Sequence, residues 1–159
     1  MNKVYLLLGS NMGNRRQQIE RAAKHINKKI GKITRRSSLY QTAAWGDEAQ
    51  ADFLNQVLIV ESRLEASVCI TGILDIETEM GRIRTVKNAP RIIDIDILYF
   101  NKDIISLPNL EVPHPAIASR RFVLTALNEM SPNFIHPVLK KTNHQLLAIC
   151  PDMLDVKKI

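Results

Sequence analysis

The chain has 159 residues, of which 45% are hydrophobic and 24% charged, as expected for one soluble globular domain spanning residues 1–159. The apolar run VYLLLG near its start is too short for a membrane span or a usual signal peptide, and its two cysteines give no disulfide framework, so we expect a cytoplasmic protein. The net charge of +6 favours an anionic partner, which includes nucleic acid, a nucleotide or a phosphorylated metabolite.

The first half of the chain alternates predicted strands and helices. Residues 3–8 form an apolar strand, and GSNMGN follows as a turn. A helix comes next and ends at Gly31, after which residues 33–42 and 53–61 are expected to be strands. A second helix ends at Gly81. The apolar positions that mark these helices are Ile19, Ala22, Ala23, Ile26 and Ile30 in the first and Cys69, Ile73, Ile76 and Met80 in the second.

The second half adds one long strand and two helices. Residues 92–100 read as a buried strand, which a short turn connects to a partner strand at 103–106. We predict one helix over 119–130, with Ser119 as its N-cap, and a final helix over about 142–150. The order β-α-β-β-α-β followed by helices fits a ferredoxin-like split βαβ core with additions.

Two aspartates interrupt the apolar strand at 92–100. Side chains alternate across a strand, which predicts one face with Ile93, Ile95, Ile97 and Tyr99 and an opposite face with Ile92, Asp94, Asp96, Leu98 and Phe100. The two carboxylates then stand roughly 6.6 Å apart and point the same way. Like charges at this spacing repel, which favours a cation bound between them. The alternative is a half-exposed strand whose polar face is solvated.

A group of cations precedes this strand. GRIR supplies Arg82 and Arg84, and Lys87 and Arg91 follow. Solvated ion pairs are the usual role of such charges, yet arginine is also suited to bidentate contact with phosphate oxygens. Because Mg²⁺ typically takes one or two carboxylates together with water and phosphate, the arginines and aspartates together predict a polyphosphate bound with magnesium.

Further candidates lie in the segment VPHPAIASRRF. His114 sits in a proline-rich loop, and Arg120 and Phe122 open the next helix. A lone histidine is more often structural than functional. Next to an arginine at a helix N-terminus, where backbone N–H groups favour anions, His114 becomes a candidate phosphate contact.

A possible site for a flat heterocycle lies earlier in the chain. Thr42, Trp45, Phe53 and Asn55 bracket a loop, and aromatic rings offer stacking faces while a carboxamide offers a donor and an acceptor. The alternative is that Phe53 belongs to the core and Asn55 is a satisfied strand residue. The GSNMGN turn lacks the GxxxxGK[ST] spacing of a phosphate loop, so it is weak support for one.

These motifs, in this order, resemble the 6-hydroxymethyl-7,8-dihydropterin pyrophosphokinase family of folate synthesis. The resemblance covers nearly the whole chain through GSNMGN, FLNQV, GRIR, KNAPRIIDIDIL and VPHP…RRF. It implies an α+β fold with a ferredoxin-like βαββαβ core, added helices, and an antiparallel sheet with helices on both faces. It also implies transfer of pyrophosphate from ATP to the pterin hydroxymethyl oxygen, with release of AMP. We expect direct in-line attack at the β-phosphorus.

The resemblance further implies the roles of individual residues. Two Mg²⁺ ions bound with ATP are expected on Asp94 and Asp96, which form the catalytic set with Arg82 and Arg91. The ATP contacts it implies are Glu77, Arg82, Arg84, Arg91, His114 and Arg120. The pterin-pocket positions are Gly9, Thr42, Ala43, Trp45, Phe53, Asn55 and Phe122, with the two phenylalanine rings on either side of the pterin. The family expectation is a monomer that binds neither nucleic acid nor membrane.

Two other functions share part of the pattern. A nucleotide cyclase or a polymerase palm would use paired aspartates and two metals on a similar fold, but needs no pterin pocket. A nucleic-acid-binding module would fit the charge and the fold. RNA readers of this fold display stacked aromatic residues on the sheet, however, and the aromatic content here is only 5%.

Overall fold

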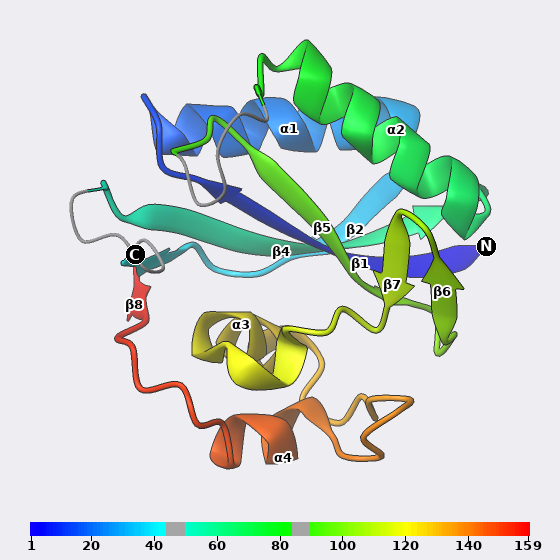
Figure 1. Cartoon of the computed structure of the whole chain (residues 1–159), viewed down its shortest axis with the longest axis vertical. Helices are drawn as coiled ribbons and strands as arrows, with labels where there is room; N and C mark the ends of the chain where they lie inside the picture. The colour runs from blue at the N-terminus through cyan, green and yellow to red at the C-terminus, as the bar shows by residue number, and fades with distance from the viewer. Residues whose placement is uncertain (44–49, 84–89) are drawn as a thin grey trace.

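The computed structural model describes residues 1–43, 50–83 and 90–159, which form an α+β fold (Figure 1). The elements are β1 (Asn2–Ser10), α1 (Arg15–Lys29), β2 (Lys32–Arg36), β3 (Tyr40–Thr42), β4 (Phe53–Ser62), α2 (Ala66–Glu79), β5 (Asp94–Phe100), β6 (Ile105–Leu107), β7 (Leu110–Val112), a 3₁₀ turn (Ile117–Ser119), α3 (Arg121–Met130), α4 (Asn143–Ala148) and β8 (Lys157–Lys158). Among the described residues, no helix has the length and apolar character needed to cross a membrane.

The main sheet has the strand arrangement predicted for the core. It is six-stranded in the order β5-β1-β4-β3-β8, with β2 also paired to β4. All of these pairings are antiparallel. The two strands joined by α1 are therefore parallel with β4 between them, and the two joined by α2 are parallel with β1 between them. This is the split βαβ arrangement, so the predicted ferredoxin-like core is confirmed.

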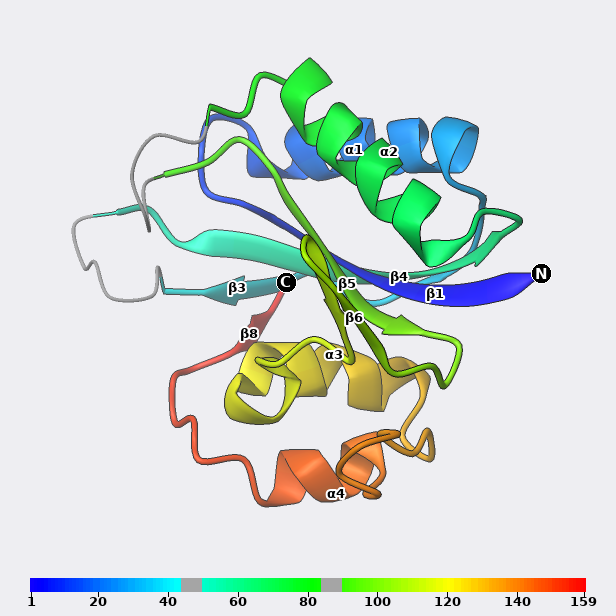
Figure 2. The same ribbon diagram turned by 45° about the vertical axis from the view of Figure 1, so that its right-hand side comes forward.

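Helices cover both faces of the sheet, as predicted. Helices α1 and α2 lie side by side on one face, whereas α3 lies on the other face with α4 packed beyond it (Figures 1 and 2). Because strand side chains alternate, the sheet contributes to two apolar layers. The layer under α1 and α2 includes Leu6, Leu8, Leu58, Ile93 and Ile95. The layer above α3 includes Tyr5, Leu7, Val57, Ile59 and Tyr99.

A β-bulge in β5 corrects the predicted faces of this strand. Tyr5 is opposite Tyr99 but Leu6 is opposite Ile97, so Leu98 is an extra residue in the pairing with β1. Tyr99 consequently packs in the layer next to α3, while Phe100 packs with Ile97 in the layer under α1 and α2. The prediction exchanged these two aromatic residues because it assumed unbroken alternation. The aspartates precede the bulge, so their shared face is unaffected.

Several predicted boundaries also change. The strand predicted at 33–42 is two strands, since β2 ends at Arg36 and β3 begins at Tyr40. The short strand predicted after β5 corresponds to β6, which pairs with β7 in a separate hairpin and not with β5. Ser119 ends the 3₁₀ turn, and Arg120 occupies the N-cap of α3 without a side-chain capping bond. The final helix is shorter than predicted and is capped by Thr142.

A polar contact ties α3 to β3 at the sheet edge. The Glu129 carboxylate accepts hydrogen bonds from the Ser38 backbone N–H at 3.0 Å and from the Ser38 and Tyr40 hydroxyls. Partial burial alone would raise the pKa of Glu129, but the hydrogen bonds from Tyr40 and Ser38 outweigh burial and lower it. Burial and the same contact raise the pKa of Tyr40 to about 12.

Candidate active site

A cleft lies on the α3 face of the sheet, where β1, β3, β4 and β5 meet the start of α3. Alternation places Leu7 with Gly9, Phe53 with Asn55, and Asp94 with Asp96 on this face. The residues that line the cleft are Leu7, Gly9, Thr42, Ala43, Gln50, Phe53, Asn55, Arg91, Asp94, Asp96, Arg120, Phe122, Asp152, Leu154 and Val156. The cleft therefore joins an end with aromatic and amide groups to an end with carboxylates and arginines.

At the aromatic end, the carboxamide of Asn55 is held in one orientation. Its Nδ2 donates to the Thr42 hydroxyl at 3.0 Å and, at the limit of a hydrogen bond, to the Tyr40 carbonyl at 3.5 Å. The backbone of Gly9 packs against the other side of this carboxamide, so closely that a Cβ atom at position 9 would lie 3.0 Å from Asn55 Oδ1. The amide and the Phe53 ring beside it form a surface suited to the edge and face of a planar heterocycle.

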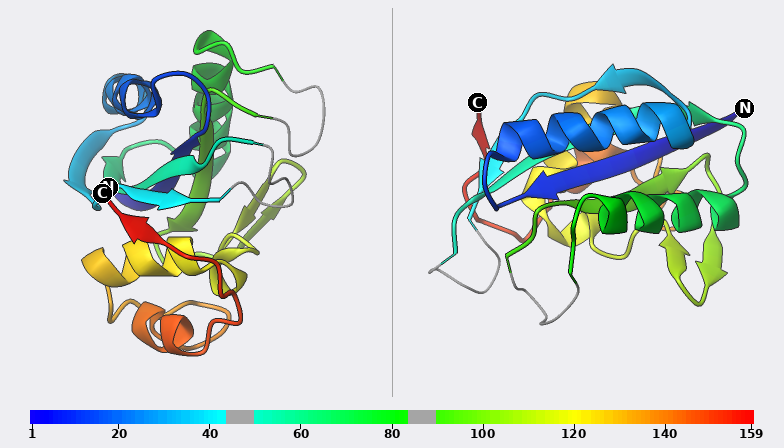
Figure 3. Two further views of the ribbon diagram at one scale, coloured as in Figure 1. Left: turned by 90° about the vertical axis from the view of Figure 1, so that its left-hand side faces the viewer. Right: turned by 90° about the horizontal axis from the view of Figure 1, so that it is seen from above.

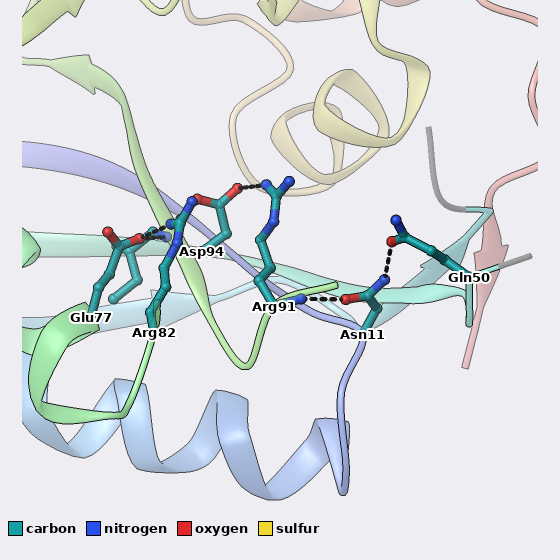
Figure 4. A network of polar contacts seen from close by, with 7 residues as sticks. Asn11, Gln50, Glu77, Arg82, Arg91 and Asp94 are labelled. Carbon is teal, nitrogen blue, oxygen red and sulfur yellow. Dashed lines mark hydrogen bonds and ion pairs between the residues drawn. The ribbon is translucent and has the colours of Figure 1, made fainter. Parts of the chain in front are cut away.

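At the charged end, Asp94 is held by two arginines (Figure 4). Arg82 donates to Asp94 Oδ1 at 2.7 Å, and Arg91 donates to Oδ2 at 3.1 Å. Arg82 also donates to Glu77 at 2.7 Å and is only 11% exposed. Burial alone would lower the pKa of Arg82, but the charges of Asp94 and Glu77 outweigh burial and raise it. Both guanidinium groups therefore have Asp94 as a partner, which an anionic ligand in the cleft would replace.

Asp96 lies in surroundings that disfavour its ionised form. Burial, together with the charges of Asp94 and Glu77, raises the pKa of Asp96 well above its ordinary value, although Arg120 and Arg82 oppose the shift. Neighbouring carboxylates that disfavour each other's ionisation accept a cation readily. The cation site expected from the strand stays a prediction.

Glu77, expected among the ATP contacts, does not line the cleft. It is 2% exposed, and its Oε2 accepts hydrogen bonds from Arg82 and from the Ile95 backbone N–H, each at 2.7 Å. Gly81, with φ of +91°, turns the chain after α2 and brings Arg82 back onto this carboxylate. The geometry therefore gives Glu77 a supporting position behind Arg82 and β5.

Asn11 joins two segments of the site and was not singled out from the sequence. Its Nδ2 donates to Gln50 Oε1 at 3.0 Å and to the Ala51 carbonyl at 3.2 Å, and its Oδ1 accepts from the Arg91 backbone N–H at 2.9 Å (Figure 4). The Arg91 guanidinium carbon lies 5.6 Å from the centroid of the Phe53 ring. The GSNMGN turn thus acts through a side-chain amide, a role that its glycine pattern did not indicate.

A second hollow adjoins the cleft along the outer edge of β5. Its lining residues are Ile70, Ile95, Asp96, Ile97, Leu107, Pro108, Asn109, Leu110, Glu111, His114 and Pro115. His114 Nδ1 accepts from the Ala116 N–H at 3.1 Å, so the proton of the neutral ring resides on Nε2. Burial and the nearby Arg120 lower the pKa of His114, although Asp94 and Glu111 oppose the shift. Asp96 borders both the cleft and this hollow.

The structure brings together most of the predicted site residues. Gly9, Thr42, Ala43, Phe53, Asn55, Arg91, Asp94, Asp96, Arg120 and Phe122 share the cleft. His114 lies in the adjoining hollow, and Arg82 and Glu77 stand behind Asp94. Trp45 and Arg84 lie outside the described residues. The lining residues that the sequence analysis missed are Leu7, Gln50, Asp152, Leu154 and Val156.

The donor set at the charged end is suited to Mg²⁺. Within residues 1–43, 50–83 and 90–159, there is no group of three or more His, Cys, Asp or Glu side chains arranged to hold a metal ion. Paired aspartates alone match an ion that completes its ligand set with water and phosphate oxygens. Asp94 and Asp96 are the residues that would hold it.

The paired carboxylates, arginines and stacking surface of this cleft are the groups expected of a nucleotide-dependent group-transfer enzyme. A family model described as 7,8-dihydro-6-hydroxymethylpterin-pyrophosphokinase (HPPK) matches residues 5–132. The chain belongs to this family and is an ATP-dependent pyrophosphokinase of folate biosynthesis. The resemblance found in the sequence is confirmed, and the cyclase, polymerase and nucleic-acid-binding alternatives are replaced by it.

Relatives support the family at the level of the sequence. The chain is 40% identical over 141 residues to a 2-amino-4-hydroxy-6-hydroxymethyldihydropteridine pyrophosphokinase of Aquifex aeolicus, covering 89% of this chain and 88% of that protein. It is 38% identical over 151 residues to the folic acid synthesis protein FOL1 of Dictyostelium discoideum, covering 95% of this chain. The chain spans only 23% of the length of this Dictyostelium protein.

A solved structure supports the fold. The wild-type HPPK-DHPS of Plasmodium falciparum crystallised with pteroate superposes with a TM-score of 0.76 at 20% sequence identity. The match covers 92% of this chain and 42% of the Plasmodium chain. At this identity the likeness shows a shared fold.

Proposed function

We propose that the chain transfers pyrophosphate from ATP to the hydroxymethyl oxygen of 6-hydroxymethyl-7,8-dihydropterin and releases AMP. The observation that carries this proposal is the position of Asp96, which borders both the cleft with Phe53 and Asn55 and the hollow with His114. Two ligands bound in these two places would meet at the paired carboxylates. Such a meeting point is what direct in-line attack on the β-phosphorus requires, because transfer depends mainly on positioning and charge neutralisation.

The pterin occupies the cleft in this proposal. Its ring lies between Phe53 and Phe122, and Asn55 and Thr42 hold its polar edge. The pair Asn55–Thr42 is already hydrogen-bonded at 3.0 Å, so little reorganisation is needed on binding. Ala43 and Gly9 contribute backbone to the same wall.

The nucleotide occupies the hollow along β5 with its phosphates toward Asp96. His114 and Arg120 then contact phosphate oxygens as neutral and charged donors respectively. Arg82 and Arg91 leave Asp94 and donate to the phosphates of the nucleotide, so one charge-assisted hydrogen bond replaces another. The exchange also withdraws Arg91 from the Phe53 ring, the surface on which the pterin stacks.

Two Mg²⁺ ions on Asp94 and Asp96 complete the proposed site. When bound, they would neutralise phosphate charge and lower the pKa of the attacking hydroxyl group. The residues of this chain orient the two substrates and balance the charge of the polyphosphate. Glu77 keeps Arg82 in place until the nucleotide arrives.

The proposal is tested by measuring AMP formation from ATP and Mg²⁺ with 6-hydroxymethyl-7,8-dihydropterin as acceptor. We expect AMP in amounts equal to the pyrophosphorylated pterin, with loss of at least 10³-fold in turnover for Asp94→Asn and Asp96→Asn. Asp103→Asn, which changes an exposed aspartate in the turn after β5, is the matched control. ADP as the product, or AMP formed without the pterin, would contradict the proposed reaction.

A further inference from the structure

The segment 151–159, called the 151–159 strap below, crosses the open side of the cleft. From α4 it passes α3 and returns to the sheet edge, where β8 lies beside β3 (Figures 1 and 3). Asp152, Leu154 and Val156 line the cleft, whereas Met153 between them is 82% exposed. This period of two shows that an extended stretch of the strap turns one side toward the cleft.

The first attachment of the strap is to the start of α3. Asp152 Oδ2 accepts from the Arg121 backbone N–H at 3.0 Å, and the Arg121 side chain donates to the Asp152 carbonyl at 2.7 Å and to the Cys150 carbonyl at 3.1 Å. Arg121 is the first residue of α3, whose own N-cap residue makes no side-chain capping bond. The Asp152 carboxylate therefore accepts a hydrogen bond from the N-terminus of α3, where the N-cap residue Arg120 provides no side-chain cap.

This attachment bears directly on the substrate site. Arg121 stands between Arg120 and Phe122, and both of these neighbours line the cleft. Asp152 Oδ1 also accepts from the Leu154 N–H at 3.0 Å, which orients the following residue of the strap. A single carboxylate thus links the start of α3, which carries Phe122, to Leu154 on the strap.

The second attachment is to the strand that carries Thr42. Gln41 and Tyr40 of β3 pair with Lys157 and Lys158 of β8, and the Ile159 N–H donates to the Leu39 carbonyl at 3.0 Å. Val156 packs against the apolar layer next to α3. The strap is therefore held at both ends by elements that form the pterin end of the cleft.

We propose that the 151–159 strap is a wall of the pterin subsite, with Leu154 as a contact residue and Asp152 as a positioning residue for Phe122. The proposal rests on the proposed function and extends it to residues outside the matched family motifs. Leu154 is 41% exposed at the cleft, so a bound ring has apolar surface to cover there. The wall excludes water from the side of the ring that the sheet leaves open.

The experiment uses the full chain with three single substitutions in the strap. Leu154→Ala removes the apolar contact, and Asp152→Asn leaves one oxygen to accept two N–H groups. Met153→Ala is the matched control, because this side chain points away from the cleft. Dissociation constants for 6-hydroxymethylpterin are measured by titration in saturating α,β-methylene-ATP and Mg²⁺, and those for the nucleotide are measured separately.

We expect Leu154→Ala to weaken pterin binding about tenfold, the effect of withdrawing about two methylene-sized groups from contact. We expect Asp152→Asn to raise the dissociation constant of the pterin several-fold. Leu154→Ala should keep the wild-type nucleotide affinity and thermal midpoint, and Met153→Ala should match the wild type in every measurement. Asp152→Asn should lower pterin affinity more than nucleotide affinity, and the weakened cap on α3 should lower its thermal midpoint. This combination separates a wall of the subsite from a purely structural segment.

Two results would overturn the proposal while leaving the proposed function intact. One is unchanged pterin affinity in Leu154→Ala. The other is a loss of nucleotide affinity in Asp152→Asn by the same factor as the loss of pterin affinity, as a structural role alone predicts. A wild-type chain that binds no pterin in the presence of nucleotide would instead refute the proposed function, and the strap assignment with it.

Discussion

Replacing Asn11 by alanine should uncouple two segments of the active site. Asn11 is 5% exposed and contacts Gln50 and Ala51 on one side and Arg91 on the other. Alanine removes all three side-chain hydrogen bonds. The bond from the Asn11 backbone N–H to the Arg91 carbonyl, at 3.2 Å, does not depend on the side chain.

The size of the effect follows from the number of bonds lost. At about 0.5–1.5 kcal/mol each, three hydrogen bonds contribute about 1.5–4.5 kcal/mol, and relaxation of the segments reduces this to about 1.5–3 kcal/mol. Asn11→Asp separates the two sides, because it keeps the acceptor for Arg91 but loses the donors to Gln50 and Ala51. Its expected cost is about 1–2 kcal/mol.

Two assays test this prediction. Urea unfolding should show the stated losses, and the gain in pterin affinity caused by α,β-methylene-ATP should fall by about tenfold or more in Asn11→Ala. Met12→Ala, at a neighbouring side chain that is 40% exposed, is the control. If Asn11→Ala unfolds at the wild-type urea concentration and keeps the full nucleotide-dependent gain, the assigned linking role is wrong.

Three further substitutions test other parts of the site and fold. Gly9→Ala places a Cβ atom 3.0 Å from Asn55 Oδ1, so pterin affinity should fall about tenfold while nucleotide affinity is retained; equal loss of both would contradict this. Glu77→Gln should lower the free energy of unfolding by about 2–4 kcal/mol, because it breaks a buried ion pair; a change below about 0.5 kcal/mol in urea would disprove that role. Glu129→Gln should lower the free energy of unfolding by up to about 1 kcal/mol at pH 7, since solvent screens this largely exposed carboxylate. The pKa of Glu129 is lowered in the fold, so its stabilisation is present above the unfolded value of 4.5 and is lost as pH falls through the folded value. If the free energies of unfolding of variant and wild type still differ at pH 2.5, the assignment is wrong.

The sequence predicted the parts of the fold that depend on local periodicity. The spacing of Ile19, Ala22 and Ile26 placed α1, and the alternation around Asp94 and Asp96 placed both carboxylates on one face. These features arise from a helix or strand geometry that a few neighbouring residues determine. Most candidate site residues followed from the same patterns together with the family motifs.

The features that sequence analysis missed depend on contacts between distant segments. The bulge at Leu98 is set by the pairing of β5 with β1, and no turn residue marks it. Asp152 caps a helix that begins 31 residues earlier in the chain, and β8 pairs with β3 across more than a hundred residues. Local composition carries no signal for such contacts, because they form only when the two distant segments meet in the folded chain.

The dependence of nucleotide affinity on Mg²⁺ shows directly whether Asp94 and Asp96 hold the metal ion. Titration of α,β-methylene-ATP into the wild-type chain should show binding at least tenfold tighter with Mg²⁺ than in EDTA, because Asp94 and Asp96 would otherwise repel the phosphates. In the double variant Asp94→Asn, Asp96→Asn, this gain should disappear while the protein remains folded. A double variant that retains the full Mg²⁺-dependent gain would show that the two carboxylates do not hold the metal.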